Sequence, residues 1–152
     1  MSEISIDVRK ANEDIAEFLD KVGNNNKEIA SKTIDKIGYT IERGVKEEAK
    51  YRKRTGYYLR SIKYRREGRL SGSVASTSRV AVYLEVGARP HRITARRKRV
   101  LRFVSHGATL FRRSVFHPGN PPYEIFKKGL KSVEGKLKDV INQAYKDLGK
   151  GI

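Results

Sequence analysis

The sequence predicts an α+β fold, with a mainly antiparallel sheet of about four or five strands packed by a long helix in the N-terminal half and by a C-terminal helix. Apolar residues recur at three- and four-residue spacing near both ends of the chain and alternate with polar residues in its middle. The strand-like segments also follow one another directly, which favours antiparallel pairing. We expect residues 1–152 to form a single domain, since no long linker or internal repeat divides them.

Residues 1–50 predict one strand and two helices. The strand comes first, because residues 4–8 alternate between apolar and polar. Asn12 and Asn26 are placed to cap the two helices, and the second helix should end near Ala49. The apolar faces are Ile15, Phe18, Leu19 and Val22 in the first helix, and Ile34, Ile37, Ile41 and Val45 in the second.

Residues 55–117 predict a basic β-sheet region, because the hydrophobic period changes to two between turns that contain glycine. The strands expected here are residues 59–64, 73–77, 80–86, 100–104 and 110–116. The proline-rich segment 117–122 ends the sheet, and residues 123–148 return to a helical period. The apolar stripe of this last helix is Phe126, Leu130, Val133, Leu137, Val140, Ile141, Ala144 and Leu148.

Positive charge is concentrated in one block of the chain. The net charge is +17, and residues 43–117 hold 21 basic and 4 acidic residues, which equals that whole excess. Of the 17 arginines, 16 lie in this block. The planar guanidinium group suits phosphates and carboxylates, whereas solubility alone would not require arginine over lysine. The pattern therefore predicts a polyanionic or acidic partner surface.

The densest basic run is Ala88-Arg-Pro-His-Arg-Ile-Thr-Ala-Arg-Arg-Lys-Arg-Val100, between two of the predicted strands. We interpret it as a projecting loop, begun by a turn at Pro90 and His91, that can become ordered on assembly. The residues expected to contact a partner or DNA are Arg89, His91, Arg92, Arg96, Arg97, Lys98 and Arg99.

A second basic patch is predicted before and within the first strands of the sheet region. Its residues are Arg52, Lys53, Arg54, Arg65 and Arg66, and the interleaved tyrosines are Tyr51, Tyr57, Tyr58 and Tyr64. Such tyrosines can stack on nucleic-acid bases beside the cations that hold the backbone. They can equally line the edge of the sheet's core or a subunit boundary, and the sequence leaves both readings open.

We expect no catalytic residue, cofactor or metal. The chain has no cysteine, and its three histidines are predicted in separate turns, without a recognised ligand spacing. A pair of Glu85 with His91 would fix a turn rather than act in catalysis. Phosphate-binding glycine loops and nucleophile elbows are missing from the sequence. No apolar stretch approaches the roughly 20 residues of a membrane span, so no membrane partner is expected.

Five short motifs occur in order between Thr55 and Leu130. They are Thr-Gly-Tyr-Tyr-Leu-Arg-Ser-Ile at 55–62, Tyr-Leu-Glu-Val-Gly at 83–87, Pro-His-Arg-Ile at 90–93, Leu-Arg-Phe at 101–103, and Arg-Ser-Val-Phe-His-Pro-Gly at 113–119. The series resembles the head–tail connector, neck and tail-completion proteins of long-tailed double-stranded DNA phages, often described as phage minor tail components. Ala88, where threonine is common, and residues 123–126 depart from the pattern, and the N-terminal helices match only in type.

The resemblance implies a virion structural protein and no catalysis. It implies a ring-forming adaptor, six- or twelve-membered, at the head–tail (neck) junction or tail end, through which genomic DNA passes. Its partners would be further copies of itself and adjacent connector, adaptor, tail-tube or tail-terminator proteins, with assembly in the host cytoplasm. The arginines would meet the DNA backbone without sequence specificity, or acidic surfaces of adjacent rings. The alternative is a stand-alone, sequence-independent nucleic-acid-binding protein.

Overall fold

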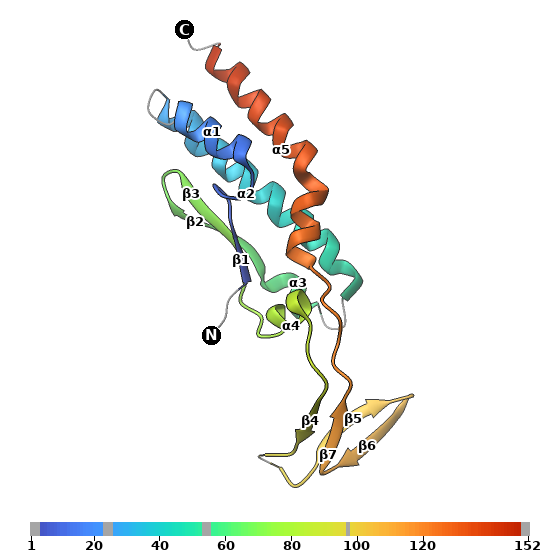
Figure 1. Ribbon diagram of the computed structural model, residues 1–152. Helices are drawn as coiled ribbons and strands as arrows, with labels where there is room; N and C mark the ends of the chain where they lie inside the picture. The colour runs from blue at the N-terminus through green and yellow to red at the C-terminus, as the bar shows by residue number, and fades with distance from the viewer. Residues whose placement is uncertain (1–3, 23–25, 53–55, 97, 150–152) are drawn as a thin grey trace.

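Two long helices, α2 (Lys27–Ala49) and α5 (Ile125–Gly149), lie along each other and form the spine of the molecule (Figure 1). The computed structural model describes residues 4–22, 26–52, 56–96 and 98–149. The spine helices meet at two glycines, because a Cβ atom on Gly44 would lie 2.5 Å from the carbonyl oxygen of Gly129. Helix α1 (Glu13–Val22) contacts both of them.

A three-stranded antiparallel sheet covers one side of α2 (Figure 1). Its strands are β1 (Ile4–Asp7), β2 (Ile62–Gly68) and β3 (Ser71–Ser76), in the order β1-β3-β2. Three short helices connect the larger elements: the 3-10 helix η1 (Lys50–Arg52), α3 (Tyr57–Ser61) and α4 (Ala81–Val86). Helices, sheet and connections together make up the body of the molecule.

The apolar faces predicted from periodicity form the core of the body. All four residues expected on α1 and all four expected on α2 are buried, and Leu137 and Val133 of α5 pack in the same cluster. Burial of each such side chain contributes about 1.5–3 kcal/mol. The predicted caps are also confirmed, because the Asn12 and Asn26 side chains accept the backbone N–H groups of Asp14 and Ile29.

The rest of the chain, residues 88–122, forms a narrow arm of two antiparallel β-ribbons (Figure 1). Strand β4 (His91–Thr94) pairs with β7 (Ser114–His117), and β5 (Leu101–Ser105) pairs with β6 (Ala108–Arg112). The two ends of the arm run side by side as a stalk, joined by Ala88 and Asn120 through two backbone hydrogen bonds. No described residue of the arm belongs to the hydrophobic core.

The predicted α+β class is confirmed, but several predicted strands are different. Residues 80–86 form helix α4 and not a strand: Val80 and Val86 are 48% and 64% exposed, so the alternation of apolar residues was not a pattern of burial. The segment 59–64 is divided between α3 and β2, and the segment 110–116 between β6 and β7. No helix among the described residues is long and apolar enough to cross a membrane.

Candidate partner-binding arm

The arm is attached to the body by contacts between α4 and the start of α5. The Glu85 carboxylate accepts the backbone N–H groups of Phe126 (3.0 Å) and Lys127 (3.2 Å), which satisfies two donors that the first turn of a helix leaves unpaired. Its negative charge is also favourable beside a helix N-terminus. The expected pairing of Glu85 with His91 is therefore wrong, since Glu85 binds α5.

Two glycines allow the stalk to form. Gly87 and Gly119 both have φ of +82°, a backbone conformation that strains residues with a side chain. A Cβ atom on Gly119 would lie 2.2 Å from the carbonyl oxygen of Ala88, so a larger residue would separate the two stalk segments. The side-chain amide of Asn120 donates to the carbonyl of Tyr83 (2.9 Å), which ties the stalk to α4.

The three histidines lie in the arm, and two of them are in strands and not in turns as predicted. His91 and His117 pair across β4 and β7 with stacked rings, 5.1 Å between centroids. The Nδ1 atom of His117 accepts the N–H of Gly119, and Nδ1 of His91 faces the carbonyl of Arg89. His106 is in the two-residue turn between β5 and β6, where it and Gly107 both have positive φ, as in a type I′ hairpin.

Each ribbon of the arm places an arginine directly opposite an exposed phenylalanine. Arg92 faces Phe116 across β4 and β7, and Arg102 faces Phe111 across β5 and β6. Directly opposed residues of an antiparallel pair share one face, so each arginine lies beside its phenylalanine. Phe116 is 65% exposed and Phe111 is 55% exposed. Val104, on the same face as Arg102, is also exposed.

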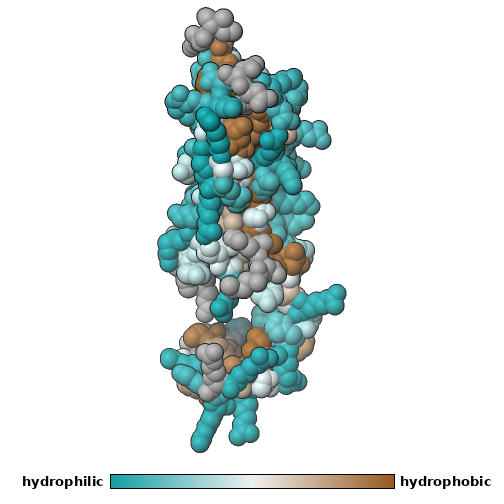
Figure 2. Space-filling view, turned by 90° about the vertical axis from the view of Figure 1, so that its left-hand side faces the viewer, coloured by the Kyte–Doolittle hydropathy of each residue, from teal (hydrophilic) through white to brown (hydrophobic). Residues whose placement is uncertain are grey.

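The charge of the arm is not compensated within it. Residues 88–122 contain nine arginines and lysines and no aspartate or glutamate. Figure 2 shows hydrophilic side chains projecting from the arm, with apolar side chains between them. A segment that combines unpaired cations with exposed large apolar groups and contributes nothing to the core has the composition of a binding surface.

The predicted contact residues are gathered on this arm, although not in a single loop. His91 and Arg92 belong to β4, and the Arg92 guanidinium donates to Ser114 Oγ (3.1 Å). Arg89 lies in the stalk, and Arg96, Lys98 and Arg99 are exposed in the connection between β4 and β5, whereas Arg97 lies outside the described residues.

Sequence reasoning missed Arg102, Arg112 and Arg113, as well as the two phenylalanines. A sequence signal for two of them exists: a His-Gly turn fixes the register of the hairpin and thereby sets Arg102 opposite Phe111.

The second predicted patch is not brought together. Arg66 binds α2 through Asp35 (2.9 and 2.8 Å) and Ser31, near the start of that helix. Arg52 follows the other end of α2, about 25 Å further along at 1.5 Å per residue. Arg65 is exposed on β2, and Lys53 and Arg54 lie outside the described residues.

The tyrosines near this patch are divided between core and surface. Tyr64 donates its hydroxyl hydrogen to Asp35 (3.0 Å), and burial together with this hydrogen bond raises the pKa of Tyr64 to about 12. Tyr58 is buried, and burial and the nearby Glu85 carboxylate raise the pKa of its hydroxyl. Tyr51 and Tyr57 are 88% and 60% exposed. Two of the four tyrosines thus have a structural role.

Two open grooves occur at opposite parts of the molecule. One, of about 610 Å³, lies at the root of the arm and is lined by Tyr83, Ile93, Asn120 and the histidine pair, among others. The other, of about 290 Å³, lies between α1 and α5. Among the described residues no cluster of three or more carboxylates and histidines is placed to hold a metal ion.

The extended, basic and partly apolar arm, whose described residues lie outside the core, is a surface suited to binding a partner. Residues 13–87 match the family described as "Bacteriophage HK97-gp10, putative tail-component". This segment of 75 of the 152 residues is similar to a phage tail-component family, which confirms the predicted resemblance to phage connector and tail proteins. No match was found among curated proteins or among solved structures.

The extent of the match differs from that of the sequence motifs. It begins at α1 and ends at Gly87, so it covers the N-terminal helices and the first two of the five motifs. The three motifs after Gly87 lie in the arm, beyond the matched segment. A phage tail component is a virion structural protein, and the fold and the family together support that coarse assignment.

Proposed function

We propose that this chain is a ring-forming adaptor of the phage virion, located at the head–tail junction or the tail end. The observation that carries the proposal is the arm, in which at least five large apolar side chains are exposed among uncompensated cations. A chain that keeps such a segment away from its own core buries it in an assembly. The residues are Ile93, Val100, Val104, Phe111 and Phe116.

A ring of identical subunits needs heterologous contacts, in which each copy uses one surface to bind and another to be bound. An arm that projects from one end of an elongated body is suited to this task, because it reaches beyond the subunit that carries it (Figure 1). Repetition around a ring would also place basic groups near a central channel. Phosphate attraction in that channel is independent of sequence, as passage of a genome requires.

The second candidate function is stand-alone nucleic-acid binding, favoured by the absence of acidic residues from the arm. Exposed phenylalanines can stack on the bases of a single strand, whereas the exposed aliphatic residues Ile93, Val100 and Val104 have no such use. These aliphatic groups therefore favour the protein contact. The two candidates differ in where the chain is found and in what it binds when isolated.

Complementation of a phage that lacks the gene tests the proposal. The wild-type chain should be present in purified virions, and a chain in which a short glycine-serine linker replaces residues 91–117 should yield separate heads and tails. The body of this variant should still fold, because the replaced segment contributes no core residue. A chain missing from virions, with submicromolar DNA affinity and a steep dependence on salt, would establish the nucleic-acid-binding function instead.

A further inference from the structure

The arm ends in a face that combines one cation with two apolar groups. Arg102 and Val104 of β5 and Phe111 of β6 share this face of the ribbon, and all three side chains are exposed. A guanidinium group flanked by an aromatic ring and a branched aliphatic chain matches a surface that offers carboxylates beside apolar side chains.

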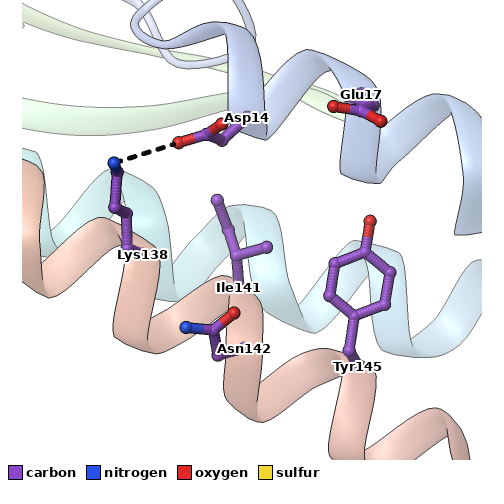
Figure 3. Close-up of a pocket in the computed structure, with 6 residues that line it drawn as sticks. All are labelled: Asp14, Glu17, Lys138, Ile141, Asn142 and Tyr145. Atoms are coloured by element: carbon purple, nitrogen blue, oxygen red, sulfur yellow. Dashed lines mark ion pairs between the residues drawn. The ribbon is translucent and has the colours of Figure 1, made fainter.

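The same chain carries such a surface on its body. Helix α1 has four acidic residues and one lysine, which gives it a net charge of −3 in a chain of net charge +17. Figure 3 shows the groove between α1 and α5, with Asp14 and Glu17 on one side and Ile141 and Tyr145 on the other. The apolar group that this groove exposes is the ring of Tyr145, which is 41% exposed and packs edge-on against the buried Phe18.

The carboxylates of this groove are only loosely engaged. Asp14 lies 3.9 Å from Lys138 Nζ, and Glu17 pairs with Lys21 of its own helix in an exposed contact. Contacts of this kind are weak and exchangeable in water, so an incoming arginine can replace them. Asn142, exposed beside them, adds a hydrogen-bonding group at the rim.

Arm and groove lie toward opposite ends of the molecule (Figure 1). The arm cannot reach the groove of its own chain, whereas it can reach that of a second copy. Such a contact is heterologous: every copy gives its arm to one neighbour and receives an arm from another, and the series closes as a ring or continues as a filament.

We propose that the arm of one copy docks on the α1–α5 groove of the next copy. Arg102 faces the carboxylates of Asp14 and Glu17, and Phe111 and Val104 pack on the exposed ring of Tyr145. The inference rests on the proposed ring function and supplies its subunit contact. The occupant is a second copy because the basic, partly apolar arm and the acidic, partly apolar groove are complementary surfaces of one sequence.

Charge reversal on the two sides tests this contact. The arm-reversed chain carries Arg102→Glu, and the groove-reversed chain carries Asp14→Lys and Glu17→Lys. Each chain alone should lose about a hundredfold of head–tail joining in a phage that lacks the gene, because like charges then face each other. Co-expression of both should restore joining, since their reversed surfaces are complementary. One chain with all three substitutions should also function alone.

A matched control is Lys63→Glu, which makes the same change of charge as the arm-reversed chain on an exposed residue of β2 and should have no effect. Either reversed chain functioning alone would overturn the inference, as would failure of the co-expressed pair to restore joining. If the arm-reversed chain also loses DNA affinity and is not rescued, the arm contacts DNA instead. Absence of the wild-type chain from virions would be a separate result, which rejects the proposed function itself.

Discussion

Arg66 and Arg102 lie in equally basic stretches of sequence but in different surroundings in the folded chain. Arg66 binds Asp35 and Ser31 of α2, so its charge is paired with a carboxylate of the body. Arg102 projects from the arm beside Phe111. The composition predicted that arginines would be free to bind a partner, but it could not distinguish Arg66 from Arg102. Asp35 comes close to Arg66 only when the chain folds.

Substitution of Glu85 tests whether this residue caps α5. Glu85→Ala should lower the free energy of unfolding by about 1–2 kcal/mol, because two N–H groups at the start of α5 lose their acceptor. Glu134→Ala, on the exposed face of α5, is the control and should change stability by less than about 0.5 kcal/mol. Urea denaturation measures both. Equal stabilities for the two variants would show that Glu85 does not cap the helix.

Tyr64 predicts how stability depends on alkaline pH. Its pKa is raised from 10.0 to about 12, first by burial and then by the hydrogen bond to Asp35. The folded chain therefore keeps a proton that the unfolded chain loses, so this contribution is complete below pH 10 and falls between about pH 10 and 12. Tyr64→Phe should make the loss of stability over this range less steep. An unchanged slope would contradict the burial of the hydroxyl.

At the scale of elements, periodicity and capping predicted the parts of the fold that bury apolar surface. Helices α1 and α2 begin and end as expected, and α5 begins at Ile125, two residues after the predicted start. All three face the core as expected, because apolar spacing repeated over ten or more residues is a strong signal of an amphipathic helix. Helix α4 could not be predicted in this way. The apolar pattern of its six residues fits a strand as well as a helix. The helix is stabilised by hydrogen bonds that Leu84 and Glu85 accept from residues at and just before the start of α5.

The close approach of α2 and α5 predicts how two glycine substitutions change stability. Gly44→Ala should destabilise the body by about 1–3 kcal/mol although alanine favours helices, because its Cβ would lie 2.5 Å from the carbonyl oxygen of Gly129. Gly135→Ala, with nothing within 4 Å of the added Cβ, should stabilise α5 by about 0.5–1 kcal/mol. Thermal unfolding compares them. A stabilising effect at both positions would mean that the helices do not approach closely at Gly44.

For the whole molecule, the division into a body and an arm explains why the sequence revealed only part of the candidate site. The basic run from Arg89 to Arg99 was evident from composition, whereas Phe111 and Phe116 were predicted only as members of one strand, residues 110–116. Their exposure depends on the chain leaving the body after Gly87 and returning to it after residue 122, which the alternation of apolar residues does not predict. The predicted loop is therefore part of a larger exposed surface, that of the whole arm.

Since the chain has no cysteine, a designed disulfide can report the contact between copies without background. Phe111→Cys with Tyr145→Cys places one thiol on the arm and one at the groove, toward opposite ends of one molecule (Figure 1). Mild oxidation of purified virions that carry this variant should give a ladder of covalent dimers and larger multimers on a non-reducing gel. Each single-cysteine variant should form no covalent species larger than a dimer, because one thiol can form only one disulfide. Only monomers from the double variant, in virions shown to contain the chain, would contradict docking of the arm on the neighbouring copy.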